Sequence, residues 1–178
     1  MRSFLFINAL LFITLLLACR NEGTVDTKTQ DRSQNNMQSV QHKAIYMSEK
    51  VVKTDREWQQ LLTPQQYVIT QKKGTERPYT GKYFNFTGRG MYQCVCCAND
   101  LFSSETKYDS GTGWPTFWAP FSEQSIRTAV DHSHFKKRIE VLCNRCDAYL
   151  GHVFDDGPPP TGLRYCINSV ALQFVAKK

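Results

Sequence analysis

The sequence lacks several features that would assign the protein to a class at once. No apolar run reaches the roughly 20 residues that a membrane-spanning helix needs, because the longest candidate covers residues 4–18. No segment repeats at the period of a solenoid protein. The net charge is +6, yet there is no basic tail or arginine ladder, and the densest basic run is residues 136–138. These absences argue against a repeat array and against a protein that binds nucleic acid.

The N-terminal segment is apolar at its centre and carries little charge. It reads MRSFLFINALLFITLLLACR: one basic residue, an apolar stretch, a small residue and Cys19. This pattern is typical of a secretion signal, and it resembles the bacterial lipoprotein signal, in which the chain is cut before a cysteine that carries lipid. We therefore expect residues 1–18 to be a signal peptide and Cys19 to be a lipid anchor. An uncleaved apolar anchor is the alternative, and both place the remaining chain outside the cytoplasm, at a bacterial membrane surface.

A polar segment with almost no aliphatic side chains follows the signal. It covers residues 19–45, and its composition cannot bury enough apolar surface to offset the chain entropy lost on folding. We expect this segment to be a disordered tether. Residues 46–178 are enough for one packed core and too few for two full domains. We predict a single domain there, and because nothing suggests an obligate partner surface, we expect a monomer.

Two helix-start signals lie at the beginning of this domain. Thr54 is followed by Glu57, and Thr63 is followed by Pro64 and Gln66. In such a capping box the threonine side chain bonds to the backbone three residues on, and the Glu or Gln side chain bonds back. Proline is favoured in the first turn. The sequence therefore predicts two short helices, the first ending near residue 62.

The rest of the domain lacks a sustained helical period. It consists of short apolar or alternating runs, rich in β-branched and aromatic residues and separated by Gly, Asn and Asp. The runs are MYQCV, TFWAPF, IRTAV, RIEVLC and YCINSVALQFV, and the last is interpreted as one strand after the loop GPPPTG. The pattern predicts a mainly β fold with antiparallel strands.

Four of the seven cysteines form two pairs with the same spacing: Cys94 with Cys97, and Cys143 with Cys146. Each Cys-x-x-Cys turn lies at a predicted strand end. Two such turns can present four thiolates to a zinc ion at about 2.3 Å each, which leaves no open coordination position. We therefore predict one structural zinc ion.

Disulfide bonds are the alternative for these cysteines, because an extracytoplasmic compartment is oxidising. Bonding Cys94 to Cys97 would, however, strain a short loop and link no distant segments, so zinc is favoured. Cys96 is surplus to the zinc site. We interpret it as a partly buried spectator, with a redox partner for another thiol as the alternative.

Cys166 stands apart from the pairs, in the run GLRYCINSV. Side chains alternate along a strand, so Arg164, Cys166 and Asn168 are expected to share one face. A nearby cation favours the thiolate, so we expect the thiol to have a pKa below its ordinary value of about 8.5 and to be nucleophilic. A buried, inert cysteine is the alternative.

Two further segments carry side chains suited to a reactive site. LGHVFDDGP places His152 upstream of Asp156, in a predicted turn-rich loop of the kind that delivers an acid or base. SGTGWPTF places Trp114 in a glycine-rich loop. Taken singly, such a histidine is more often structural and such a tryptophan more often part of a core. Together with Cys166 they are hard to attribute to packing.

The chain contains, in this order, TERPYTGKY, the first Cys-x-x-Cys turn, SGTGWPTF, the second Cys-x-x-Cys turn, LGHVFDDGP and GLRYCINS. Together these motifs resemble the type B methionine sulfoxide reductases, which reduce the R epimer of methionine sulfoxide. The resemblance covers essentially everything from residue 46 onward. It implies two antiparallel sheets with small N-terminal helices, zinc held by the four paired cysteines, and peptide-methionine (R)-S-oxide reductase activity.

The resemblance also implies roles for individual residues. Cys166 matches the nucleophile, which attacks the sulfoxide sulfur, becomes a sulfenic acid and releases methionine. His152 matches the group that supplies the proton. The polar residues that match the surrounding network are Asn168, Asp156 and Arg164. The aromatic residues that match the substrate wall are Trp114 and Phe154.

The sequence departs from the family pattern at one position. Many members carry a second, resolving cysteine in the glycine-rich loop, where this chain has Thr112. The usual internal disulfide therefore cannot form, and the sulfenic acid must be reduced in another way. We expect an external dithiol protein of the thioredoxin type, with a small thiol or a disulfide to Cys96 as alternatives.

Two other functions are compatible with the same residues. A zinc-ribbon-like binding module on a lipoprotein would leave Cys166 unreactive. A thiol peroxidase or redox sensor would use Cys166 but would be indifferent to the epimer of a sulfoxide.

Overall fold

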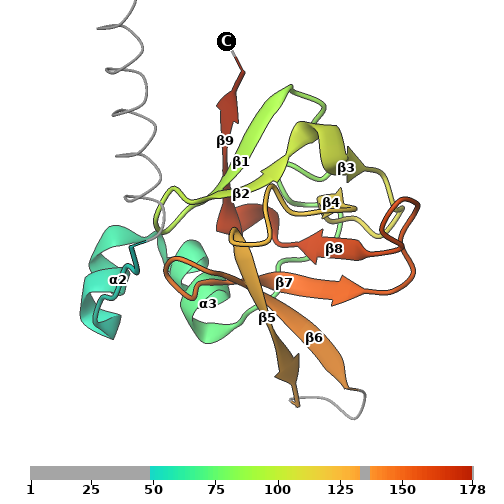
Figure 1. Ribbon diagram of the computed structural model, residues 1–178. Helices are drawn as coiled ribbons and strands as arrows, with labels where there is room; N and C mark the ends of the chain where they lie inside the picture. The colour runs from blue at the N-terminus through green and yellow to red at the C-terminus, as the bar shows by residue number, and fades with distance from the viewer. Residues whose placement is uncertain (1–48, 133–136, 178) are drawn as a thin grey trace, which may run out of the picture. The chain divides into compact units, whose positions relative to one another are not determined.

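The computed structural model describes residues 49–132 and 137–177, which form two antiparallel sheets (Figure 1). The smaller sheet has the strand order β2-β1-β9, and the larger has the order β3-β4-β8-β7-β6-β5. The strands of the smaller sheet are β1 (Gly90–Cys94), β2 (Asp100–Ser103) and β9 (Leu172–Ala176). The strands of the larger sheet are β3 (Lys107–Tyr108), β4 (Thr116–Phe117), β5 (Ile126–Asp131), β6 (Arg138–Cys143), β7 (Tyr149–Phe154) and β8 (Arg164–Ile167). The predicted mainly β fold is confirmed.

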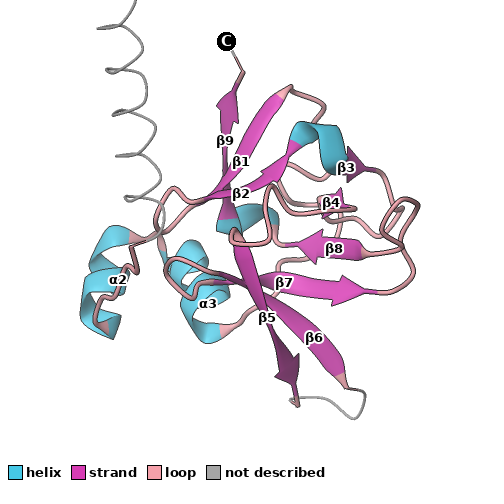
Figure 2. Cartoon of the chain, in the orientation of Figure 1, coloured by secondary structure: helices cyan, strands magenta, loops and turns pink. Residues whose placement is uncertain are grey.

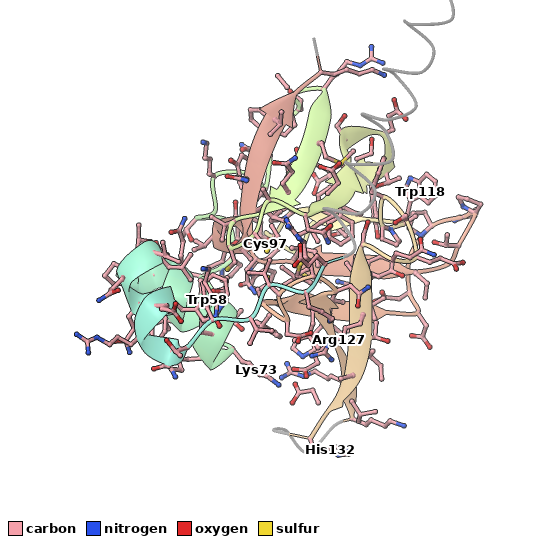
Figure 3. All side chains as sticks on the ribbon, turned by 60° about the vertical axis from the view of Figure 1, so that its left-hand side comes forward. Trp58, Lys73, Cys97, Trp118, Arg127 and His132 are labelled. Atoms are coloured by element: carbon pink, nitrogen blue, oxygen red, sulfur yellow. The ribbon has the colours of Figure 1, made fainter. Side chains whose placement is uncertain are left out.

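Both predicted helices are present, α2 (Asp55–Leu61) and α3 (Pro64–Lys72), and Figure 2 shows them next to each other beside the sheets. Each begins with a complete capping box, from Thr54 and from Thr63. The chain leaves α3 through Lys73, whose Nζ lies 2.8 Å from a carboxylate oxygen of Glu140 in β6. Figure 3 shows Lys73 at this end of the helix. The ion pair ties the end of α3 to the larger sheet.

Aromatic side chains link the two sheets. Tyr92 of β1, Phe102 of β2 and Phe117 of β4 are completely buried. The rings of Phe102 and Phe117 are stacked with their centroids 4.4 Å apart, and Tyr92 meets Phe117 edge-on at 5.0 Å. Burial of such rings is a large part of the free energy that holds one sheet against the other.

The final apolar run is not the single strand that the sequence predicts. It is divided into β8, in the larger sheet, and β9, in the smaller sheet, by a 3-10 turn η2 (Ser169–Ala171). The cause is a change in hydrogen bonding: the backbone N–H groups of Ser169 and Val170 donate to the carboxylate of Glu76 instead of a neighbouring strand. TFWAPF likewise forms a strand only at β4, and the N–H of Trp118, just after it, donates to the carbonyl of Thr106 in the 3-10 turn η1 (Ser104–Thr106).

The predicted signal peptide, Cys19 and the tether lie outside the described residues. Within the described ranges, no helix combines the length and the apolar character that crossing a membrane requires.

Candidate functional site

The two Cys-x-x-Cys turns have the same local structure. Cys94 ends β1 and Cys143 ends β6. In each turn the N–H group four residues after the first cysteine donates to that cysteine's carbonyl, from Ala98 at 2.8 Å and from Asp147 at 2.9 Å. Both donor residues adopt the left-handed conformation, with φ of 58° and 59°. Because the same turn occurs at both sites, the two thiols of each pair point toward the thiols of the other pair.

The four paired sulfurs form one compact cluster. The Sγ atoms of Cys94 and Cys146 are 3.6 Å apart, as are those of Cys97 and Cys143, and all four lie within 4.8 Å of one another. A tetrahedral zinc with bonds of about 2.3 Å needs sulfurs roughly 3.8 Å apart. A disulfide needs about 2.05 Å, and all described cysteines are free. The donor set therefore fits one structural zinc ion.

Arg145 supports this cluster and was not singled out from the sequence. It is 5% exposed, and its guanidinium donates to the carbonyl of Cys97 at 2.7 Å and to that of Glu49 at 3.2 Å. It thereby joins the second turn to the first, near the centre of the molecule where Figure 3 labels Cys97. Cys96 is not among the clustered thiols, and its sulfur lies 3.7 Å from Nε2 of Gln71 in α3.

Cys166 lies at a separate place, beside a cavity of about 140 Å³. Its Cα is paired with that of His152 across the β7–β8 ladder, and both side chains line the cavity. The backbones are very close here: a Cβ on Gly151 would lie 2.1 Å from the carbonyl oxygen of Cys166. Only glycine fits at this position, so the ladder itself sets the relative placement of thiol and imidazole. The remaining cavity residues are Thr75, Trp114, Arg138, Tyr149, Phe154 and Asn168.

His152 is held at both ring nitrogens. Its Nε2 lies 2.9 Å from Oδ2 of Asp131 and its Nδ1 lies 3.1 Å from the hydroxyl of Tyr149. A carboxylate can only accept, so Nε2 carries the proton and the Tyr149 hydroxyl donates to Nδ1. Burial lowers the pKa of His152 below its ordinary value, against the opposing effect of Asp131. The imidazole is therefore neutral at pH 7. His152 lies in strand β7, and the prediction of a loop there is wrong.

A β-bulge explains why Tyr149 and His152 face the same cavity. Residues three apart on a regular strand point to opposite faces. Here the register with β6 shifts between Val141 and Leu142, so that Leu150 is skipped in the pairing. The extra residue reverses the alternation. Burial also raises the pKa of Tyr149 to about 12, which keeps its hydroxyl protonated as a donor.

The thiol of Cys166 is half-buried, and burial raises its pKa above the ordinary value. A hydrogen bond from Thr112, at 3.9 Å from the sulfur, and the charge of Arg164 both act in the opposite direction. The expected net lowering of this pKa is wrong: Arg164 acts in the expected direction, but the effect of burial is larger. The Cys166 thiol is therefore harder to ionise in this site than an exposed thiol.

Arg164 and Asp156 form a bidentate ion pair with N···O distances of 2.7 and 2.8 Å, and neither residue lines the cavity. The guanidinium also lies over the ring of Phe154, 4.3 Å from its centroid. The Asp156 side chain is 60% exposed and lies outside the cavity lining, whereas Phe154 lies within it. The ion pair therefore holds Arg164 in place over the ring of Phe154. Asp156 acts on the cavity only through these two residues.

Trp114 and Asn168 complete the set of predicted residues in the cavity. The indole Nε1 of Trp114 donates to the carbonyl of Glu76 at 3.2 Å. Asn168 is 3% exposed, and its side chain accepts from the backbone N–H of Glu76 at 3.0 Å. Strand alternation thus correctly indicated that Asn168 and Cys166 lie together.

Several residues of the site were missed from the sequence. These are Thr75, Glu76, Asp131, Arg138 and Tyr149. Glu76 lies in a motif that supported the resemblance, but no role was assigned to it. The others come from the loop after α3, the facing ends of β5 and β6, and the bulged start of β7. No spacing rule in the sequence would bring these segments to Cys166.

Comparison with known proteins gives one consistent family. Residues 62–176 match the family described as SelR domain. A protein of Hahella chejuensis named peptide methionine sulfoxide reductase MsrB is 58% identical over 126 residues, which cover 71% of this chain and 91% of that protein. Proteins of the same name from Chromohalobacter salexigens and Methanosarcina mazei are 58% and 50% identical over 129 residues, which cover 72% of this chain and 97% and 92% of theirs.

Proposed function

This chain belongs to the SelR family and is a peptide-methionine (R)-S-oxide reductase; we propose that it works through a sulfenic acid at Cys166. The observation that carries this mechanism is the convergence on one small cavity of a thiol, an imidazole, an amide and an indole, from Cys166, His152, Asn168 and Trp114. The cavity admits the end of a side chain and excludes a folded protein surface.

The proposed reaction transfers the sulfoxide oxygen to Cys166. The sulfur of Cys166 attacks the sulfoxide sulfur, the sulfur–oxygen bond of the substrate breaks, and the products are methionine and a cysteine sulfenic acid. The leaving oxygen needs a proton. The Cys166 thiol loses its proton as its sulfur attacks, and Nδ1 of His152, which carries no proton in the resting site, takes that proton up. Nδ1–H then donates to the Tyr149 oxygen, which frees the tyrosine O–H to give its proton to the leaving oxygen and to be restored from Nδ1. Asp131, on Nε2, stabilises the imidazole as it takes part.

The walls of the cavity support a choice of epimer. The rings of Trp114 and Phe154 offer an apolar surface for the substrate methyl group, and Asn168 and Tyr149 offer donors for the oxygen. A sulfoxide sulfur is chiral, so only one epimer can meet both surfaces while presenting its sulfur to Cys166.

The sulfenic acid is reduced from outside the chain in this proposal. Two external thiols would form a disulfide, restore the Cys166 thiol and release water. Position 112 carries a hydroxyl, which is bonded to Ser110 at 2.8 Å and lies 3.9 Å from the Cys166 sulfur. Cys96 contacts α3 and does not line the cavity, which supports a dithiol protein of the thioredoxin type over an internal disulfide.

We also propose that the enzyme acts as a monomer at the extracytoplasmic face of a bacterial membrane, held by lipid on Cys19. The support is the sequence of residues 1–19, which resembles a lipoprotein signal. A Cys19→Ala variant is expected to leave the membrane fraction; continued partition with membranes would contradict the lipid anchor.

One assay tests the reaction itself. Methionine formation is measured from separate peptides with R or S sulfoxide, using a dithiol protein as reductant. Wild type should act on the R peptide alone, and Cys166→Ser should lose activity by at least about a thousand-fold. Equal use of both epimers with fast peroxide consumption would favour a thiol peroxidase. No turnover, together with a Cys166 thiol inert to alkylation, would favour a binding module.

A further inference from the structure

The segment 76–83 has no part in the reaction described above, although it lies against the site on two sides. It follows α3, and Glu76 contacts both the Trp114 loop and the turn after Cys166. We infer that Glu76 is a positioning residue, which sets the orientation of Asn168 and of Trp114 in the cavity. The inference rests on the reductase activity and adds a residue that acts through two others.

The carboxylate of Glu76 caps the turn η2, which the side chain of Asn168 would otherwise cap. Asn168 is the N-cap of η2, and an asparagine there usually accepts from the first N–H groups of the turn with its own side chain. It makes no such bond here. Instead, the two oxygens of Glu76 accept from Ser169 N–H at 2.6 Å and from Val170 N–H at 2.9 Å. The amide of Asn168 is thereby left free to face the cavity.

The backbone of Glu76 then fixes that amide. The N–H of Glu76 donates to Oδ1 of Asn168 at 3.0 Å, and Nδ2 of Asn168 donates to the carbonyl of Leu150 at 3.0 Å. An amide nitrogen carries two hydrogens, so one N–H of Asn168 remains for the substrate. The carbonyl of Glu76 meanwhile accepts from Nε1 of Trp114 at 3.2 Å. One residue thus holds both walls through three different groups.

Close packing keeps this arrangement in place. A Cβ on Gly81 would lie 2.4 Å from the Cβ of Ser169 and 2.6 Å from Oε1 of Glu76, so the segment can approach only with glycine there. The hydroxyl of Ser169 accepts from the N–H of Tyr83 at 2.7 Å. The turn that follows Cys166 is therefore held from the outside at several points.

Burial of the charged Glu76 carboxylate costs folding free energy, and this cost is hard to explain if the residue only caps a turn. Its side chain belongs to a residue 6% exposed, and no ion pair within residues 49–132 and 137–177 includes it. Burying a carboxylate is unfavourable unless hydrogen bonds offset the loss of water. An asparagine cap would close η2 with no buried charge. What the carboxylate adds is the release and orientation of Asn168.

The main test is Glu76→Gln in the full chain. The amide has the same shape but only one accepting oxygen, so it cannot meet both N–H groups of η2. We expect kcat/KM for the R-sulfoxide peptide to fall by about 10- to 100-fold at a temperature where the variant is folded. The kcat should fall because Asn168 is displaced, and KM should rise because Trp114 is no longer held. Unchanged kinetic constants in folded Glu76→Gln would overturn the inference.

A matched control separates positioning from stability. Thr54→Ala removes the cap of α2, far along the chain from the cavity, and should lower Tm while leaving kcat and KM unchanged. If Thr54→Ala lost activity in the same proportion to its fall in Tm, Glu76 would be only structural. Absence of R-sulfoxide reduction by wild type would instead refute the proposed function.

A spectroscopic measurement gives a readout that loss of stability does not move. In a ¹H–¹⁵N spectrum, the indole N–H of Trp114 should shift in Glu76→Gln, while those of Trp58 and Trp118 should stay in place. An unshifted Trp114 signal would contradict the inference. If Glu76→Gln does not fold, Ser169→Ala loosens the same turn by removing one acceptor. It should lower kcat/KM about 2- to 5-fold, and no change would count against positioning.

Discussion

Among the cysteines that the structure describes, the paired set and Cys166 lie in environments that differ in almost every physical respect. In the paired set, four sulfurs face one another, each strand end repeats the same turn, and all coordination positions of a zinc ion are supplied by the chain. At Cys166, one sulfur borders a cavity: the hydroxyl of Thr112 lies 3.9 Å away, the charge of Arg164 acts on the thiol, and His152 is its neighbour across the ladder. A closed arrangement makes thiolates inert ligands, whereas an open one leaves a thiol to react.

The two environments are nevertheless joined by one strand and one turn. β6 begins at Arg138, beside the cavity, and ends at Cys143, in the zinc cluster. The turn that holds Cys146 leads directly into β7, which carries Tyr149 and His152. The metal site therefore fixes the elements from which the reactive site is built, although it does not touch the cavity.

Loss of a zinc ligand should have the largest effect on the protein. Cys143→Ser is expected to remove zinc and to destabilise the fold by several kcal/mol, because binding of a structural metal contributes directly to folding. Metal content and thermal unfolding measure this. Cys96→Ser, in the same turn as two ligands, is the control and should keep both zinc and turnover. A Cys143→Ser protein with normal Tm would show that the cluster is not structural.

A second cysteine beside Cys166 should make this environment resemble the paired one, because two thiols would then face each other. In Thr112→Cys the new thiol lies near the Cys166 sulfur, at a place now 3.9 Å away. After one turnover we expect an internal disulfide, detected by mass and by loss of two free thiols. Wild type should show a sulfenic acid instead, which a dimedone probe traps. A trapped sulfenic acid of equal amount in Thr112→Cys would mean that the loop cannot close the bond.

Removing the carboxylate behind His152 should weaken the reaction while leaving the zinc cluster intact. Asp131→Asn is expected to lower kcat by about ten-fold, because the amide stabilises the working imidazole less well. Asp147→Asn is a suitable control, since Asp147 is exposed and pairs with Arg127 beside the other site. Equal losses in the two variants would indicate a general effect of surface charge.

The smallest expected effect is on the pH dependence of stability. The pKa of His152 is lowered in the folded state by burial, so the unfolded chain binds this proton more readily. Stability should therefore be complete above the ordinary histidine pKa of about 6.5 and should decrease as the pH falls below it. Denaturant unfolding between about pH 5 and 7.5, roughly the range in which histidine titrates, measures the slope. His152→Gln should flatten that slope, and an identical slope would assign it to other groups.

The features that the sequence predicted correctly share a short-range cause. Capping boxes are set by residues three apart, and Cys-x-x-Cys turns by residues within one turn, so both helices and the metal site could be predicted. The same holds for Asn168 beside Cys166. In each case the structure depends on residues only a few positions apart, and that spacing can be read from the sequence.

What could not be predicted depends on long-range contacts or on irregular backbone. Tyr149 reaches the cavity only because β7 has a bulge, and no residue type marks that bulge. Asp131 lies on β5, which is two strands away from β7, the strand of His152, in the larger sheet. The pKa of Cys166 depends on burial, which is a property of the packed fold. Each of these needs tertiary structure before it can be stated.

Because His152 and Cys166 are paired directly across the β7–β8 ladder, activity depends on the register of these two strands. A slip of one residue between β7 and β8 would bring Tyr165 opposite His152 and turn the thiol to the other face. A molecule with this slipped register would therefore have no reductase activity, and not merely a weaker preference for one epimer. Reduction of the sulfoxide therefore takes place only in chains whose ladder has closed in the native register, and the specific activity of a preparation measures the fraction of such chains.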